Sequence, residues 1–202
     1  LFLLIYIALL AIPYIQHKKV SASYQNEFAR RSFYSDTAGT ERVAYINDNT
    51  DALLYWLHML DEAKDEIILS TFDFNADKSG QDMMASLLHA ADRSVSVRIY
   101  NPINLLKPWN LQARMHDKYV IVDQKMYLLG GRNTTNLFLG DYSKSKNIDR
   151  ELFVYETAEN DSSSIRQLTD YFESVWALSD SKEYTCKKMT KKIQSCKAKL
   201  EN

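Results

Sequence analysis

Apolar and polar positions between residues 42 and 178 change period several times, which predicts alternating strands and helices. Strand-like runs occur at 43–46, 66–74, 95–99, 118–122, 126–129 and 151–155. Apolar residues spaced by three and four predict helices at 50–64, 81–92 and 164–176. We therefore expect an α/β layered sandwich in which helices flank a mixed β-sheet.

The first fifteen residues are almost all apolar and are followed by His17, Lys18 and Lys19. A helix that crosses a bilayer needs about 20 such residues. The chain starts with Leu1, so we expect it to begin inside a longer reading frame or after processing. We interpret residues 1–19 as a membrane anchor or its remnant, with the remainder on the cytoplasmic side. A signal-peptide core and a buried helix are the alternatives.

Two further segments lie outside the predicted sandwich, which we place at residues 42–178. Residues 20–41 are polar without a clear period and are interpreted as a linker. Residues 179–202 are rich in lysine, with an apolar stripe formed by Cys186, Met189, Ile193, Cys196 and Leu200. This pattern predicts a basic amphipathic tail helix that pairs with another helix or lies on an anionic membrane. An ordinary surface helix remains the alternative.

Charge and cysteine content exclude some classes of function. The 202 residues carry a formal net charge of -1, which argues against a surface built to hold nucleic acid. The two cysteines have neither the number nor the spacing of a disulfide framework or a metal site. The five glycines form no phosphate-binding loop of the nucleotide-binding type.

The segment 115–133 reads MHDKYVIVDQKMYLLGGRN and holds the most informative residues. His116 and Lys118 are two positions apart, so on a strand their side chains project to the same face. A neutral imidazole can attack phosphorus, and an ammonium group can bind the phosphate oxygens. Gly130 and Gly131 let the backbone approach, and the Asn133 amide can donate to the same phosphate. This chemistry requires no metal or cofactor, and we expect none.

This segment resembles the HxKxxxxD signature of the phospholipase D superfamily. The similarity extends over about residues 42–176, from the run EAKDEIILSTFDF to a closing YFESVW helix. With the apolar N-terminal segment, the layout is most similar to bacterial cardiolipin synthase-like proteins. The resemblance implies that Lys118, Gly131 and Asn133 bind phosphate. It also implies a catalytic set of His116, Lys118, Asp123 and Glu151, in which Asp123 is a structural charge that steadies the motif.

The carboxylate partner of the nucleophilic histidine has two candidates. A histidine nucleophile needs its second nitrogen held by an acceptor, and the family places an acidic residue at the start of the next strand. IDRELFVYE offers Asp149 and Glu151 there. We favour Glu151 because it directly opens the apolar strand. The alternative is that both acids are surface charges.

Only one HxKxxxxD motif is present, although the family normally combines two, one histidine attacking and the other protonating the leaving alcohol. We expect the second half from a homodimer mate about a twofold axis or from a C-terminal half beyond Asn202. The connection from Ile99 to His116 is shorter than is usual in the family, so we also expect part of the sheet to be absent.

The expected function is phosphatidyl transfer or phosphodiester hydrolysis on phospholipids at the cell membrane, through a phosphohistidine at His116. One alternative is a dimeric nuclease of the same superfamily, against which the near-neutral charge counts. Another is a non-catalytic membrane module that retains a relic half-site.

Overall fold

The computed structural model describes residues 1–15, 21–23, 37–90, 98–100, 106, 108, 115–179 and 181–183. The chain divides into two compact units, one formed by residues 1–39 and 101–114 and the other by residues 40–100 and 115–202. The first unit contains helices α1 (Phe2–Leu10) and α2 (Ile12–Ile15). Within the described ranges, no helix combines the length and the apolar character that crossing a membrane requires.

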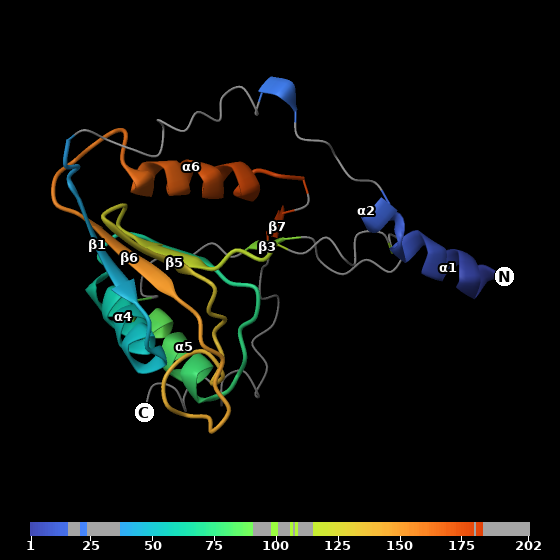
Figure 1. Ribbon diagram of the computed structural model, residues 1–202, viewed down its shortest axis with the longest axis horizontal. Helices are drawn as coiled ribbons and strands as arrows, with labels where there is room; N and C mark the ends of the chain where they lie inside the picture. Colours follow the sequence, from blue (N-terminus) through green and yellow to red (C-terminus); the bar gives the residue numbers. More distant parts are fainter. Residues whose placement is uncertain are drawn as a thin grey trace. The chain divides into compact units, whose positions relative to one another are not determined.

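Five strands of the second unit form one sheet in the order β1-β6-β5-β4-β2 (Figure 1). Their bounds are β1 (Glu41–Ile46), β2 (Ile67–Ser70), β4 (Tyr119–Val122), β5 (Met126–Gly130) and β6 (Glu151–Glu156). Each neighbouring pair is antiparallel, so the mixed sheet expected from the sequence is wrong for these strands. The physical reason is that β3 (Arg98–Tyr100) does not enter this sheet but pairs with β7 (Ser181–Glu183).

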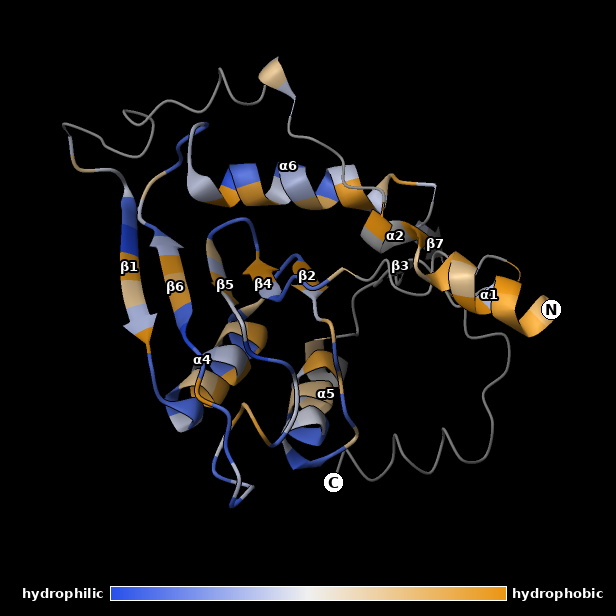
Figure 2. Cartoon of the chain, turned by 45° about the vertical axis from the view of Figure 1, so that its right-hand side comes forward, coloured by the Kyte–Doolittle hydropathy of each residue, from blue (hydrophilic) through white to orange (hydrophobic). Residues whose placement is uncertain are grey.

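Helices cover both faces of the sheet, which confirms the expected α/β layers. Helices α4 (Asn49–Glu62) and α5 (Lys78–Ala90) lie on one face and α6 (Ser164–Trp176) lies on the other (Figure 1). Alternate residues of β4 point to opposite faces, Val120 and Val122 into the α4–α5 core and Tyr119 and Ile121 toward α6. Helix α6 turns its hydrophobic residues toward the sheet (Figure 2).

Polar side chains cap α4 and α5 close to the predicted starts of these helices. The Asp48 carboxylate caps α4 by accepting from the backbone N–H groups of Thr50 and Asp51, at 2.7 and 3.2 Å. Helix α5 starts three residues earlier than predicted because Asp77 accepts from the Gly80 N–H at 3.2 Å. Gly80 therefore lies inside the helix rather than before it.

Two predicted strands are shorter in the structure. The run 66–74 forms β2 only as far as Ser70, because residues 73–75 form hydrogen bonds with Thr134 instead. The Thr134 N–H donates to the Asp73 carbonyl, and the Asn75 N–H donates to the Thr134 carbonyl, both at 3.0 Å. The run 118–122 forms β4 from Tyr119, so His116 and Lys118 precede the strand.

Several sequence predictions concern residues outside the described ranges. These are residues 91–97, most of the connection 101–114, most of the linker 20–41 and residues 184–202 of the tail. Residues 181–183, which we predicted as part of the tail helix, form strand β7.

The β4–β5 hairpin is fixed by Asp123, which has a positive φ of 52°, as has Gln124 at 50°. These values match the turn that suits the twist of paired strands. The Asp123 carboxylate accepts from three backbone N–H groups of the α4–β2 loop, those of Lys64, Asp65 and Glu66, at 2.8–2.9 Å. Asp123 thus ties the hairpin to that loop.

We predict that Asp123→Asn lowers the free energy of unfolding by about 1–3 kcal/mol, because its amide NH2 would face a backbone N–H and the anionic acceptor would be lost. Asn tolerates positive φ, so the variant isolates the carboxylate. Urea unfolding measures the change. Asp65→Ala is the control, since Asp65 contributes its backbone N–H. Equal unfolding midpoints for Asp123→Asn and wild type would contradict the assigned role.

Candidate active site

The candidate site residues gather at one end of the sheet. Because neighbouring strands are antiparallel, β4 starts, β5 ends and β6 starts at this end of the sheet. It therefore brings together His116 and Lys118, the turn from Gly130 to Asn133, and the acidic residues at 149 and 151. The segment after β2, residues 71–75, reaches the same end through its bonds to Thr134.

His116 and Lys118 are in direct contact, although neither lies within the strand. The Lys118 ammonium is 2.9 Å from Nδ1 and 3.2 Å from Nε2 of the His116 ring, and it donates to the His116 carbonyl at 2.7 Å. Lys118 is only 2% exposed. Burial lowers the pKa of its ammonium, while Asp149 and Asp117 act in the opposite direction. The pair therefore presents a buried cation beside a possible nucleophile.

Asp117 points to the opposite face, as the alternation along a strand predicts. Its carboxylate accepts from the Tyr171 hydroxyl of α6, and its backbone carbonyl accepts from the Ser70 hydroxyl at 3.4 Å. These bonds fix the backbone between His116 and Lys118 from the other side of the sheet.

Phe72 lies against both members of the pair, and the sequence reasoning did not identify it. Its ring centroid is 4.7 Å from that of His116, and the Lys118 ammonium lies 5.4 Å from the same ring. Such a contact favours cationic neighbours and restricts the imidazole. The available signal was the position of Phe72 near the end of the strand-like run 66–74.

Asp149, the other acidic candidate, lies over Gly131. A side chain at Gly131 would put its Cβ 2.1 Å from a carboxylate oxygen of Asp149, so Asp149 lies directly over this glycine. Its charge acts on Lys118, raising the pKa of the ammonium. Glycine at position 131 thus lets a carboxylate approach the turn, as well as giving access to its backbone.

Glu151, which we favoured as the partner of His116, binds other groups. It is 1% exposed and accepts from the Trp56 indole N–H at 3.2 and 3.3 Å. The Arg132 guanidinium lies 3.4 Å from its carboxylate, and both side chains are fully buried. The structure therefore does not bring Glu151 together with the His116 ring. The sequence could not distinguish the two acids, because Trp56 and Arg132 are remote from that strand in sequence.

Asn133 lies two residues beyond Gly131, in the same turn. Its side-chain oxygen is buried and has no hydrogen-bond partner among the described residues. The unpartnered atom is a hydrogen-bond acceptor, so it cannot itself bind a phosphate oxygen. The expectation that the amide NH2 of Asn133 donates to a phosphate stays a prediction.

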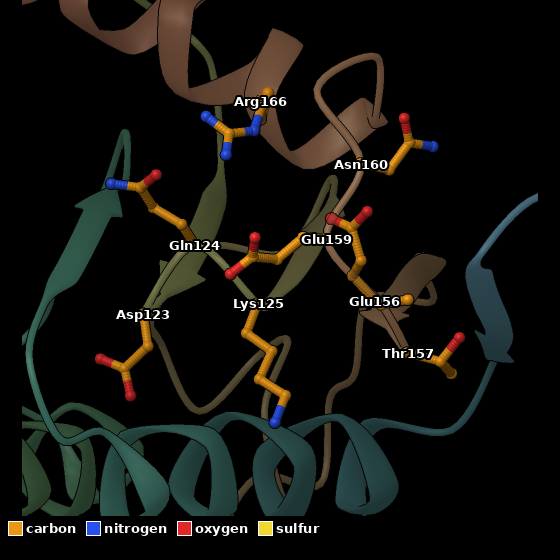
Figure 3. A pocket seen from close by; sticks show the side chains of 9 residues that line it. Asp123, Gln124, Lys125, Glu156, Thr157, Glu159, Asn160 and Arg166 are labelled. Carbon is orange, nitrogen blue, oxygen red and sulfur yellow. The ribbon is translucent and has the colours of Figure 1, made fainter.

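Asp123 lies away from these groups, five residues past Lys118 along β4, or about 16 Å on an extended strand. It lines a hollow of about 490 Å³ at the opposite end of the sheet (Figure 3). The hollow is surrounded by Lys125, Glu156, Glu159 and Arg166. None of these groups lies beside His116, so we place the candidate site at the His116 end.

No group of three or more potential metal ligands of the His, Cys, Asp and Glu types occurs among the described residues.

Burial raises the pKa of Glu151 to about 7, although the Arg132 charge and the Trp56 N–H both oppose this shift. The folded protein then retains a proton that the unfolded chain loses near pH 4.5. The contribution of Glu151 to the free energy of unfolding is thus fully present below this pH and decreases by about 3 kcal/mol as the pH rises to about 7. We predict that Glu151→Gln removes this part of the pH dependence, measured by urea unfolding between pH 5 and 8.

Trp56→Phe provides a second test, because it removes the N–H that favours the carboxylate. We expect the fall in stability to move to higher pH in this variant. An identical pH dependence in wild type and Glu151→Gln would show that Glu151 does not titrate in this range.

Comparison with known proteins gives information at the level of fold. No family model matches the chain, and no curated protein sequence matches it. Among solved structures, Nuc from Salmonella typhimurium, described as a phospholipase D family member, matches with 16% identity and a TM-score of 0.50, over 71% of this chain and 97% of Nuc. NucT from Helicobacter pylori matches with 12% identity and a TM-score of 0.50, over 71% of this chain and 99% of NucT.

A phosphatidylserine synthase from Haemophilus influenzae Rd KW20 matches with 14% identity and a TM-score of 0.55, over 79% of this chain. The match covers 43% of that synthase, so the chain corresponds to less than half of it. All three identities are low, and they establish the architecture alone. The chain therefore has the fold of the phospholipase D family.

Proposed function

We propose that this chain supplies half of a phosphodiester-transfer site in which His116 is the nucleophile. The observation that supports this most directly is the contact between the buried Lys118 ammonium and the His116 ring, 2.9 Å from Nδ1. A phosphoryl group bonded to a ring nitrogen would place its oxygens within reach of that ammonium. Asn133 and the Gly131 backbone lie on the turn next to it.

In the proposed first step, a lone pair of a His116 ring nitrogen forms a bond to phosphorus while the bond from phosphorus to the leaving alcohol oxygen breaks. The leaving oxygen takes a proton from an acid, which we assign to the histidine of a second HxKxxxxD half. In the second step, water or an alcohol attacks phosphorus, its proton passes to that second histidine, and the N–P bond breaks. Lys118 neutralises the phosphoryl oxygens throughout.

The second half is proposed to come either from another copy of this chain about a twofold axis or from a further segment of a longer protein. The fold comparisons fit both arrangements. Nuc and NucT are covered over almost their full lengths, whereas the phosphatidylserine synthase is covered over 43%.

The proposed substrate is a phospholipid, with phosphatidyl transfer or hydrolysis of the cardiolipin synthase type. This rests on the apolar N-terminal run, with Lys18 and Lys19 after it, and on the phosphatidylserine synthase among similar folds. We propose a location at the cell membrane with residues 42–178 on the cytoplasmic side.

A second candidate is a dimeric nuclease of the same superfamily. The near-complete coverage of Nuc and NucT favours it, because each is about as long as one half. The net charge of -1 counts against it, since phosphate neutralisation supplies most of the affinity for nucleic acid.

We predict that His116→Ala abolishes turnover of labelled phosphatidylglycerol, a loss of at least about 10³-fold, because no other group replaces the nucleophile. Lys118→Ala should lose nearly as much. His58→Ala is the matched control, because His58 is exposed on α4, and it should retain wild-type turnover. Circular dichroism checks that each variant folds.

The same preparations incubated with DNA distinguish the two candidate substrates. Cleavage of DNA without lipid turnover would replace the lipid proposal by the nuclease. Lipid turnover that survives in His116→Ala would refute the assignment of the nucleophile.

A further inference from the structure

Arg132 lies between two residues of the proposed phosphate site, Gly131 and Asn133, yet its side chain points into the core. The residue is 1% exposed. Its Nε donates to the Asn49 side-chain oxygen at 3.1 Å, and its Nη2 donates to the Asn47 carbonyl at 3.0 Å. Both acceptors lie at the N-terminal end of α4. The guanidinium therefore ties the turn after β5 to the start of this helix.

The remaining nitrogen of this guanidinium, Nη1, lies near the Glu151 carboxylate. The distance is 3.4 Å, close enough for an ion pair but without a hydrogen bond, and the same carboxylate accepts from the Trp56 indole N–H. Glu151 pairs with Gly130 across the sheet, and a Cβ at Gly130 would come within 2.3 Å of the Glu151 Cγ. Because Gly130 has no side chain, the Glu151 side chain can lie against β5 at this position.

Asn49 extends this connection to the loop that leads to Asp149. Its amide NH2 donates to the Asn147 carbonyl at 3.0 Å and to the Leu137 carbonyl at 3.5 Å. One buried network therefore contacts the turn that carries Asn133 and the segment that precedes Asp149. On the other side of the turn, Thr134 is held by the backbone of residues 73–75.

Stability alone is a poor explanation for this buried ion pair. Removing two charges from water is costly, and apolar residues of similar volume are often as stabilising as the pair or more so. What an apolar pair cannot reproduce is the set of directed bonds from a planar guanidinium to fixed acceptors. The network therefore determines where the turn lies.

We propose that Arg132 and Glu151 are positioning residues that hold Asn133 and the Gly131 backbone where they bind the phosphate of the substrate. Glu151 acts through Arg132 rather than on His116. This inference rests on the proposed function, because it assumes that a phosphate binds beside Lys118.

The test is a titration of the ¹⁵N-labelled 202-residue chain with inorganic phosphate, followed through the side-chain amide signal of Asn133. Arg132→Lys keeps a cation beside Glu151 but loses the planar fork, so we expect phosphate affinity to fall by roughly tenfold or more through misplacement of the turn. Arg150→Lys, an exposed neighbour, is the control and should bind as wild type does.

The double variant Arg132→Met with Glu151→Leu removes both buried charges together. The Asn47 carbonyl, the Asn49 side-chain oxygen and the Trp56 N–H then lose their partners, so its urea midpoint should fall below that of wild type, and phosphate is titrated in buffer in which circular dichroism shows the variant folded. We expect its phosphate affinity to remain as weak as that of Arg132→Lys. Glu151→Gln provides a further neutral variant of similar shape, and above pH 7, where the wild-type carboxyl is ionised, it should also bind phosphate more weakly than wild type.

Wild-type phosphate affinity in the double variant or in Arg132→Lys would overturn the positioning role. If these variants bind normally while Lys118→Ala loses binding, the inference fails and the proposed site stands. If wild type does not bind phosphate, or if Lys118→Ala binds as wild type does, the proposed function fails together with the inference.

Discussion

The contact between the Lys118 ammonium and the His116 imidazole is the interaction on which the other features of the site depend. Lys118 is 2% exposed, and burial destabilises its charged form. The hydrogen bond to the His116 carbonyl and the charges of Asp149 and Asp117 act in the opposite direction. The position of Lys118 leaves a cation next to an imidazole. A cation in this position can neutralise the oxygens on phosphorus while a ring nitrogen forms its bond, which is the role proposed for Lys118.

The antiparallel order of the sheet explains why groups distant in sequence meet at this contact. β4 starts where β5 and β2 end and where β6 starts, so four connections converge at one end of the sheet. Asp123 performs a different task at the opposite end, where it holds the hairpin against the α4–β2 loop. One motif thus places the His116–Lys118 contact at one end of a strand and a structural anchor at the other.

The sequence predicted the local features well, because they depend on nearby residues. The bounds of α6 match the predicted helix 164–176, and α4 starts one residue before the predicted position, because apolar spacing determines both helices. The proximity of His116 and Lys118 also agrees with their spacing, although β4 starts only at Tyr119. The expected α/β layers are present, whereas the mixed sheet was wrong because strand order depends on distant pairing.

The choice between Asp149 and Glu151 could not be made from the sequence. It depends on Trp56 and Arg132, which hold Glu151 in the core, and on Gly131, over which Asp149 lies. The role of Phe72 could not be predicted from the sequence either, because its contact with His116 forms only when β2 pairs with β4. These partners are set by tertiary packing rather than by spacing along the chain.

The most direct test of the central claim is to find the atom that becomes bonded to phosphorus. The protein is mixed with phosphatidylglycerol, quenched in denaturant at neutral to alkaline pH, digested and examined by mass spectrometry. We predict a phosphatidyl group on the peptide that contains His116, and its absence in His116→Ala. An adduct on a different residue, or turnover with no adduct on His116 at any quench time, would contradict the mechanism.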